Sequence, residues 1–521
     1  MKRPTILAAA FFCVFTVSVF GGETPNILLI LVDDMGYGDS RVYNPDSQVP
    51  MPNLEALAQR GMVFTDAHSA AGTCAPSRYS VLTGNYPWRG RKPGGTWRYN
   101  DPCQILDHQE TIGTLLKKAR YHTAIFGKLH QGGHFRGLAT PDAFIHGKLE
   151  DDHEVIDFAE RFRRGPLEYG FDHSFVLPNG IQGEPYAAFE DDKLAGDPVH
   201  LKIWRQGEYG LSVIPKDGVG LSDYDSSQVG PQLTREALAF IERHQEANRR
   251  GGDDRPFFIH YCSQVLHGPT TPPQSFAGHK IRGATFSHAT DMFVELDVTL
   301  GLFVDALNKH GLLTDTLIIV TSDNGGWFYD AYLEHNHATN GALKGSKGTV
   351  WEGGHRVPFI AAWGDGTQTG SRVPPNSKND QLIAGQDLYA TFAELIGQPT
   401  EPDQGLDSWS FLPALLGEKP TSRRDHLIVQ ANQRGLTQVR KGKSIPRQGR
   451  AYQYKALREA SWKLIVNATS ASPEALYDLA SDPQEEDNLI TKPESAGRVA
   501  AMMKRYQGIL QSERSTPAHA P

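Results

Sequence analysis

The segment from Thr73 to Gly84 combines residue types that could do chemistry, reading Thr-Cys-Ala-Pro-Ser-Arg-Tyr-Ser-Val-Leu-Thr-Gly. A lone cysteine is more often a small buried thiol near a helix start, because free cysteine is among the most buried residue types. Here, however, Arg78 follows Cys74 by four positions, which places both side chains on one face of a helix. A thiol beside a guanidinium makes this segment the first candidate for a reactive centre.

Four oxygen-bearing side chains come directly after two apolar runs. Asp33 and Asp34 follow Asn-Ile-Leu-Leu-Ile-Leu-Val, and Asp323 and Asn324 follow Thr-Leu-Ile-Ile-Val-Thr-Ser. An acidic pair in such a place can simply cap the next helix. Two such clusters together favour a metal site, and carboxylates with an amide oxygen suit a hard cation. Calcium is the first choice and magnesium the second, because zinc would call for thiolate or several histidine ligands.

Two lysines and two histidines are the remaining candidates. Lys128 and His130 follow a third apolar run, His267 follows a fourth, and Lys347 lies in a glycine-rich stretch. A single lysine is usually solvated surface, and most of the twenty histidines must be structural. The net charge of -8 argues against a nucleic-acid partner. It would also repel an anionic substrate, so a protein that binds such a substrate must concentrate cationic side chains at the binding site.

The apolar runs predict the elements that bring these side chains together. Near-continuous apolar runs are typical of strands buried on both faces of a parallel sheet, and ligands bind beyond the carboxyl ends of such strands. Helical patterns alternate with the runs up to about residue 400, which predicts an α/β/α sandwich around a large, mostly parallel mixed sheet. The predicted strands are residues 26–32, 123–126, 257–262 and 316–321, and the predicted helices are residues 52–60, 110–119, 232–248, 291–310 and 387–396.

A smaller domain is predicted after this one. The larger domain is predicted to span residues 23–424, and its end, from about residue 397, reads as a linker that begins with Gly-Gln-Pro-Thr-Glu-Pro. Residues 425–521 predict an α+β domain made of an antiparallel sheet plus a helix. Its expected elements are strands at 426–430, 453–457 and 462–466 and a helix near 498–511.

The first 22 residues read as a secretory signal peptide. Met-Lys-Arg precedes an apolar run that ends in Gly-Gly and is too short to span a membrane, and nothing later approaches a span. We therefore expect an exported protein, periplasmic or secreted, with no membrane segment after cleavage. Cleavage removes Cys13 and leaves three cysteines, an odd count that indicates a thiol with another fate. Cys103 and Cys262 either pair or stay reduced.

The pattern C-x-P-S-R-x-x-x-L-T-G, which fits Cys74 to Gly84 without a mismatch, is the signature of type I sulfatases, within the alkaline phosphatase superfamily. Four further segments resemble motifs of that family in the family order: I-L-V-D-D-M-G-Y-G-D, G-K-x-H, S-D-N-G-G and K-G-x-x-x-E-G-G. The resemblance covers nearly all of the exported chain. As a whole, the chain resembles bacterial sulfatases that act on sulfated polysaccharides or their oligosaccharides. This resemblance implies that the protein hydrolyses a sulfate ester on such a substrate.

The resemblance implies that Cys74 is a precursor. A formylglycine-generating or sulfatase-maturating enzyme would oxidise it to formylglycine, an aldehyde whose hydrate attacks the sulfate ester. Residue 74 would then also join Asp33, Asp34, Asp323 and Asn324 as a ligand of the metal ion.

The resemblance also assigns the cations and the histidines. Arg78, Lys128 and Lys347 would stabilise negative charge that spreads over the sulfuryl oxygens in the transition state. His130 is assigned to the hydroxyl of the nucleophile and His267, with Lys347, to the leaving oxygen, although the two histidines can exchange roles.

The chain departs from the family pattern in a few places. Leu129 and Gln131 replace the usual residues of G-K-W-H-L-G, which alters the pocket wall. Asn179 and Gly180 stand where many relatives carry a serine that contacts the sulfate. Lys344 competes with Lys347 for the role of the second lysine, and the spacing to the E-G-G element favours Lys347.

Other readings stay open at this stage. The same fold serves phosphatases, phosphodiesterases and phosphonate hydrolases, and a relative with an unmodified cysteine could bind carbohydrate without catalysis. Three histidines have no predicted role, namely His335, His337 and His355; the first two either form a metal pair or lie in a solvated loop.

Overall fold

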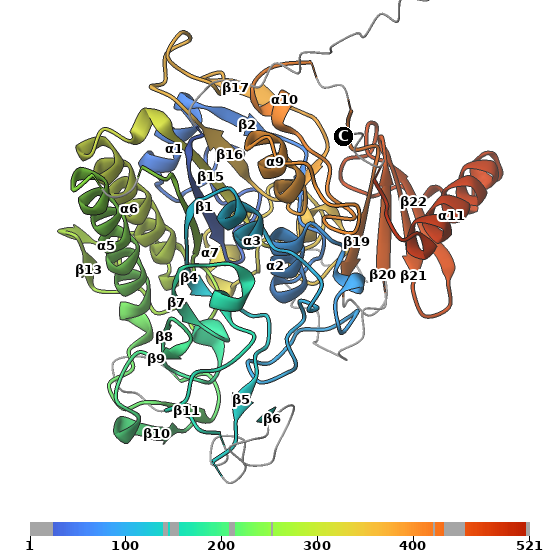
Figure 1. The fold of residues 1–521 in the computed structure, drawn as a ribbon. Helices are drawn as coiled ribbons and strands as arrows, with labels where there is room; N and C mark the ends of the chain where they lie inside the picture. Colours follow the sequence, from blue (N-terminus) through green and yellow to red (C-terminus); the bar gives the residue numbers. More distant parts are fainter. Residues whose placement is uncertain are drawn as a thin grey trace, which may run out of the picture.

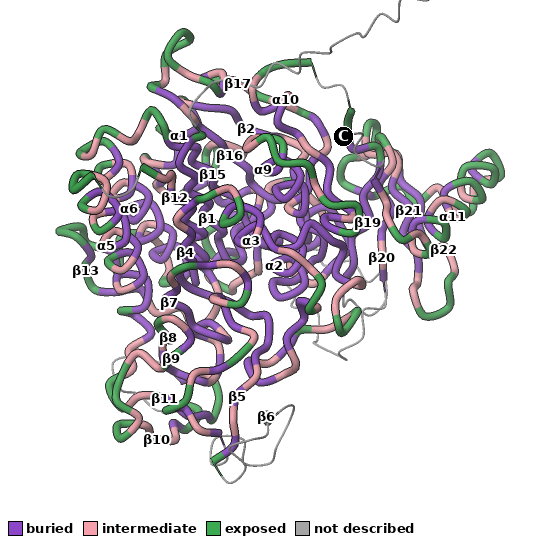
Figure 2. Tube along the Cα trace, in the orientation of Figure 1, coloured by how far each residue is buried: buried purple, intermediate pink, exposed green. Residues whose placement is uncertain are grey.

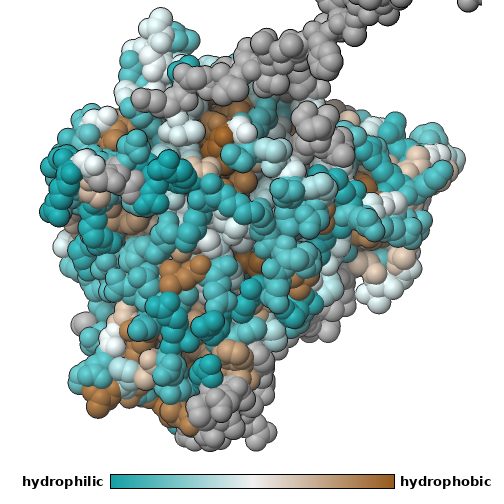
Figure 3. Space-filling model, in the orientation of Figure 1, coloured by the Kyte–Doolittle hydropathy of each residue, from teal (hydrophilic) through white to brown (hydrophobic). Residues whose placement is uncertain are grey.

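The computed structural model describes residues 24–138, 144–145, 156–207, 214–251, 254–419, 422–431 and 454–516. The predicted signal peptide lies outside these residues. No helix within the described ranges is long and apolar enough to cross a membrane. The face shown in Figure 3 is largely hydrophilic, with apolar residues in small separate groups.

A ten-stranded sheet forms the centre of the larger part of the molecule (Figure 1). Its five middle strands run parallel, and antiparallel pairs extend it on both sides. In spatial order the strands are β17 (Ser377–Asn379), β2 (Met62–Phe64), β16 (Phe359–Ala362), β15 (Thr316–Ser322), β1 (Asn26–Val32), β12 (Phe257–Cys262), β4 (His122–Lys128), β7 (His173–Leu177), β8 (Phe189–Glu190) and β9 (Lys193–Leu194). The predicted fold class and the four predicted strands are confirmed.

Helices cover both faces of this sheet. On β1, Ile27 and Leu29 pack with one group of helices, while Leu28, Ile30 and Val32 pack with the other. Both faces of the strand are therefore buried, which explains its continuous apolar sequence. The first face carries α2 (Cys74–Thr83), α3 (Ile112–Lys118) and α9 (Asp387–Leu395), and the second carries α1 (Pro52–Arg60), α5 (Val229–Arg249) and α6 (His288–Lys309).

Short elements occupy the connections between these larger ones. The paired short strands are β3 (Ala67–His68) with β18 (Ile383–Ala384), β5 (Phe135–Arg136) with β6 (Phe144–Ile145), β10 (Leu201–Trp204) with β11 (Gly218–Leu221) and β13 (Ser275–Phe276) with β14 (His279–Lys280). The short helices are α7 (Asp330–Glu334), α8 (Glu352–His355) and α10 (Leu412–Leu415).

The C-terminal part is a four-stranded antiparallel sheet with one long helix, at the red end of Figure 1. Its elements are β19 (His426–Ala431), β20 (Tyr454–Glu459), β21 (Trp462–Asn467), β22 (Ser472–Asp478) and α11 (Ala496–Gln511). One face packs against α11. The other face takes up Val350 and Trp351 of the larger part and is buried against it (Figure 2).

Close packing of α5 against α6 buries a carboxyl group. A Cβ at Gly230 would come 1.6 Å from Glu295 Oε1, so the two helices approach where glycine leaves room. Glu295 is 2% exposed and accepts a hydrogen bond from Gln264 Nε2 at 3.1 Å. Burial raises the pKa of Glu295 to about 8 from the ordinary value of 4.5. The folded state therefore keeps a proton that the unfolded state loses.

We expect Glu295→Gln to stabilise the protein increasingly as pH rises above about 4.5. Between about pH 4.5 and 8, the unfolded state loses the Glu295 proton while the folded state keeps it. The free energy of unfolding of the wild-type protein therefore falls as pH rises through this range. Above the folded-state pKa the loss of unfolding free energy is complete, and a pKa difference of this size sets an upper bound of about 4 to 5 kcal/mol on it. Thermal melting should show a higher Tm than wild type at pH 9 and an equal Tm at about pH 4, below both pKa values. The exposed Glu246→Gln should change neither.

Candidate active site

The carboxyl ends of the middle strands bring the predicted site residues together. Val32 at the end of β1 lies beside Ser322 of β15, so the acidic residues that follow these two strands emerge at the same edge. Lys128 ends β4 two strands away. At this edge Asp34 N donates to Asp323 Oδ1 at 3.2 Å, and Asn324 Nδ2 donates to Asp34 Oδ1 at 2.8 Å.

Helix α2 begins at residue 74 and points its first turn at this edge. Cys74 Sγ lies 3.5 Å from His130 Nδ1 and is 3% exposed. One turn later, Arg78 Nε donates to Asp323 Oδ2 at 2.9 Å, and its Nη1 donates to the carbonyl of Lys128 at 3.0 Å. Cys74 and Arg78 therefore share one helix face and both reach the strand ends.

The oxygens at this edge fit a hard cation. Asp33, Cys74 and Asp323 each offer one ligand atom, and these three atoms lie within 4.8 Å of one another. Asp33 Oδ1 and Asn324 Oδ1 are buried without a hydrogen-bond partner, which is costly for polar atoms unless a further group satisfies them. Asp33, Asp34, Asp323, Asn324 and residue 74 would hold calcium, and the ion would supply positive charge for a bound oxyanion.

Three cations balance the three carboxylates. Lys128 Nζ lies 2.6 Å from Asp33 Oδ2, and Lys347 Nζ lies 2.5 Å from Asp34 Oδ1. Burial opposes charge on both members of these pairs. Even so, Asp34 and the other anionic groups nearby together outweigh burial and raise the pKa of Lys347, while Lys128 and the other cationic groups together outweigh burial and lower the pKa of Asp33. Both groups stay charged at neutral pH.

Two site residues have a left-handed backbone that side chains rarely adopt. Asp34 has φ 66° and His130 has φ 55°. Such conformations cost of the order of 1 to 3 kcal/mol and gather at functional sites. Before His130, the backbone of β4 also comes close to that of β12, because a Cβ at Gly127 (φ 96°) would lie 1.9 Å from the carbonyl oxygen of Cys262. The backbone is therefore bent so that both side chains face the site.

His130 and His267 are neutral bases in this environment. Burial, with Lys128 as the main charged neighbour, holds the pKa of His130 well below its usual value; for His267 the causes are burial and Lys347. His267 Nδ1 lies 2.9 Å from the carbonyl of Gly268, which makes this nitrogen the donor and leaves Nε2 as the basic one.

Lys347, not Lys344, reaches the acidic edge. Lys344 Nζ donates to the carbonyl of Glu485 at 2.6 Å and lies 3.7 Å from the ring centre of Trp351. It therefore faces the C-terminal sheet.

The three histidines without a predicted role have different surroundings. His335 is exposed and stacks on Phe286, whereas His337 is buried, with Nε2 2.8 Å from Asp39 Oδ1. The solvated-loop interpretation is therefore wrong for His337, because a carboxylate about 300 positions away binds it. His355 is buried against the C-terminal sheet. In the described chain neither His335 nor His337 belongs to a cluster of three metal-binding groups.

The two other cysteines of the described residues are not paired. Cys103 and Cys262 are free and buried. Cys103 Sγ lies 3.0 Å from the hydroxyl of Tyr169. The reduced alternative is the one found.

One polar side chain near Lys128 was not predicted. A Cβ at Gly180 (φ 70°) would come 2.6 Å from Gln182 Oε1 and 3.0 Å from Lys128 Cδ. Gln182 Oε1 is buried and has no hydrogen-bond partner. The Gln182 amide thus occupies the space beside Lys128 that a larger residue at position 180 would fill, and no local sequence pattern indicates this.

Oxygens that fit a hard cation, the three cations of Arg78, Lys128 and Lys347 and two neutral histidines gather at the edge of a mostly parallel sheet, an arrangement suited to an enzyme that hydrolyses esters of an oxyanion. The chain belongs to the sulfatase family, whose family model matches residues 25–398. It is similar to the N-acetylgalactosamine-6-O-sulfatase of Bacteroides thetaiotaomicron, with 30% identity over 516 residues covering 90% of each chain. Human arylsulfatase A is 31% identical over 476 residues, covering 89% of this chain and 83% of that protein.

A solved structure gives the same result for the fold. A Bacteroides thetaiotaomicron protein from the metabolism of multiple glycosaminoglycans has a TM-score of 0.75 and 26% identity, covering 94% of this chain and 100% of that chain. The similarity therefore extends over the larger part and the C-terminal sheet together.

Proposed function

We propose that this sulfatase hydrolyses a sulfate ester on a sulfated polysaccharide or oligosaccharide, with residue 74 as formylglycine and with bound calcium. The observation that carries the proposal is the arrangement around Cys74. Asp33 Oδ1 and Asn324 Oδ1 are buried there without a hydrogen-bond partner, close to the cations of Arg78, Lys128 and Lys347. Calcium is preferred over magnesium because calcium accepts a set of protein oxygens in flexible geometry, whereas magnesium usually keeps several waters and is held by one or two carboxylates.

The chain's own residues would divide the chemistry as follows. Formylglycine at residue 74 supplies, as its hydrate, the hydroxyl that attacks sulfur. Arg78, Lys128 and Lys347 bind the sulfuryl oxygens and stabilise their charge in the transition state. The protonated Lys347, together with His267, would serve the leaving sugar oxygen and supply its proton. His130, next to residue 74, would take the proton from the hydroxyl group of the hydrate, so that the sulfate bound to residue 74 is expelled and the aldehyde is restored. The pair of histidines can exchange these tasks.

Maturation and export belong to the same proposal. The Cys74 thiol is 3% exposed, so a formylglycine-generating or sulfatase-maturating enzyme must reach it before the chain closes over it. The N-terminal signal would send the protein to the periplasm or the medium, where sulfated polysaccharides are met. The curated relative named above acts on a 6-O-sulfated N-acetylgalactosamine, which makes that sugar the first candidate.

The experiment compares the sulfate and phosphate monoesters of one phenol on protein co-produced with a maturation enzyme. We expect the sulfate ester to be preferred by at least about 100-fold in kcat/KM, and activity to be lost on chelation and restored by calcium, because the oxygen ligands select a hard cation. Preference for phosphate would instead support the phosphatase or phosphonate hydrolase reading. A panel of sulfated oligosaccharides that includes 6-O-sulfated N-acetylgalactosamine then identifies the sugar.

A further inference from the structure

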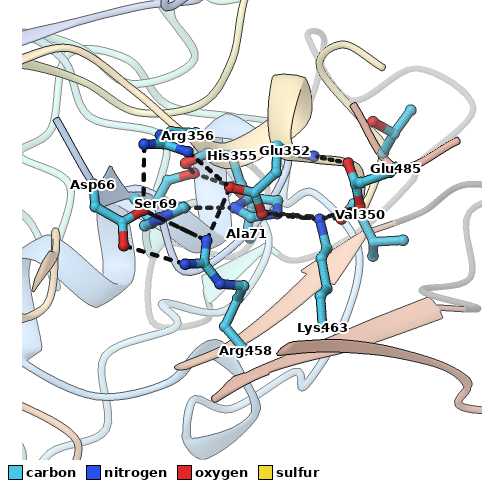
Figure 4. Close-up of polar contacts among 12 residues, drawn as sticks. Asp66, Ser69, Ala71, Val350, Glu352, His355, Arg356, Arg458, Lys463 and Glu485 are labelled. Atoms are coloured by element: carbon cyan, nitrogen blue, oxygen red, sulfur yellow. Dashed lines mark hydrogen bonds and ion pairs between the residues drawn. The ribbon is translucent and has the colours of Figure 1, made fainter. Parts of the chain in front are cut away.

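A buried cluster of charged side chains lies between the C-terminal sheet and the turn that carries Lys347 (Figure 4). It contains three carboxylates, three cations and two histidines, so its formal charges balance when the histidines are neutral. We call it the interdomain cluster. Its members are Asp66, Glu352, Glu485, Arg356, Arg458, Lys463, His68 and His355.

Glu352 is the centre of the interdomain cluster. Its Oε2 accepts from Arg458 Nη1 at 2.9 Å, and its Oε1 accepts from Lys463 Nζ at 3.0 Å. Arg458 and Lys463 lie opposite each other on β20 and β21, so the C-terminal sheet presents both cations together. Glu352 and Lys463 are fully buried. Removing one member of such a buried ion pair is strongly destabilising, because the charge of the remaining member is then buried without an opposite charge beside it.

The interdomain cluster also fixes the backbone on both sides of Lys347. Glu485 Oε2 accepts from the backbone N–H of Glu352 at 2.8 Å, and the Glu485 carbonyl accepts from Lys344 Nζ at 2.6 Å. Between these anchors Trp351 packs into the core of the C-terminal sheet. The turn is therefore attached to that sheet at both ends, while the Lys347 amino group projects to Asp34 at the site.

A second branch of contacts reaches the segment before Cys74. Lys463 Nζ lies 3.2 Å from His355 Nε2, His355 Nδ1 lies 2.9 Å from His68 Nδ1, and His68 Nε2 lies 2.9 Å from Asp66 Oδ1. With both histidines neutral, each group in this chain donates to the next. The Ser69 backbone N–H donates to the His355 carbonyl at 2.8 Å. The same sheet thus supports both the Lys347 turn and the approach to residue 74.

A metal ion does not account for the interdomain cluster. His68, Glu352 and His355 do offer ligand atoms within 4.8 Å of one another. Both Glu352 oxygens, however, already accept from a cation, and an added metal would lie beside the buried charges of Arg458 and Lys463. Repulsion between charges at such distances is strong in a buried site.

We propose that the interdomain cluster positions Lys347 for sulfate ester hydrolysis, with Lys463 of the C-terminal sheet as its main positioning residue. This inference rests on the role proposed for Lys347. It gives the C-terminal sheet a part in the reaction through the turn that it holds.

The test is a double-mutant cycle on matured, full-length protein. Lys463→Met should lower kcat by about 10- to 100-fold, because a small displacement of a catalytic group has effects of that size. In a Lys347→Ala background the same substitution should change kcat less than about twofold, since the group that it positions is gone. Lys492→Met, which removes the same side chain from an exposed pair with Asp487, is the matched control and should leave kcat unchanged.

The outcomes separate the two proposals. An equal loss in both backgrounds, or no loss from Lys463→Met, overturns the positioning role and leaves the proposed function standing. A wild-type rate for Lys347→Ala overturns the role of Lys347 itself, and this inference with it. If Lys463→Met does not fold, Glu485→Gln takes its place in the cycle, because the amide keeps the shape and the bond to the Glu352 N–H but loses its charge beside Lys463.

Discussion

Cys74→Ala should abolish turnover while leaving the fold intact. The substitution removes the only source of the nucleophile, and loss of a nucleophile typically lowers kcat by several orders of magnitude. The structural change is small, since one buried sulfur is lost at the start of α2 and its contact is a 3.5 Å approach to His130. Steady-state rates on an aryl sulfate, together with the far-UV circular dichroism spectrum, check both parts.

Cys103→Ala is the matched control for this prediction. It removes another buried thiol, one that contacts Tyr169, and should keep kcat close to wild type. Mass spectrometry of the peptide that contains residue 74 provides an independent measurement, with the aldehyde expected in active protein and the thiol in protein made without a maturation enzyme. Full activity in Cys74→Ala, or an intact thiol in active protein, would show that the nucleophile has been misassigned.

The central strands could be predicted because their sequences carry the physical signal themselves. The strands at residues 26–32 and 257–262 are apolar except for Asn26 and His260, and the structure has them with the same bounds. Their polar ends then had to converge, since neighbouring parallel strands end at one edge. By contrast, β2 and β17 have three residues each, too few to show a period.

The charged residues of the interdomain cluster could not be predicted from local sequence. Arg458 and Lys463 read as ordinary solvated charges on a short strand pair, and they are buried only because Glu352 lies opposite them, more than 100 positions away. His337 is a similar case, since Asp39 decides its burial. Burial of a charge depends on a partner that only the folded chain supplies.

Lys128→Met should have the second large effect on catalysis. The substitution keeps most of the side-chain volume and removes one buried cation from the place where sulfuryl charge would develop. Loss of one such preorganised group costs about 3 kcal/mol, which corresponds to a fall in kcat of about 100- to 1,000-fold. Lys117→Met, which removes a half-exposed lysine paired with Asp172 at 2.8 Å, should leave kcat within about twofold of wild type.

The same variant should shift the acid limb of the pH–rate profile, which separates loss of a cation from general damage. In the wild-type protein burial acts to raise the pKa of Asp33, but the surrounding cationic groups, of which Lys128 contributes most, together hold the pKa below its ordinary value. Without Lys128 the Asp33 carboxylate takes up a proton at higher pH, so the residual activity of Lys128→Met should fall off at a higher pH than that of wild type. An unshifted acid limb would mean that Lys128 does not control the charge of Asp33. A kcat above about one tenth of wild type would mean that Lys128 does not bind the transferred group, because loss of one preorganised cation that contacts the oxyanion lowers kcat by more than this.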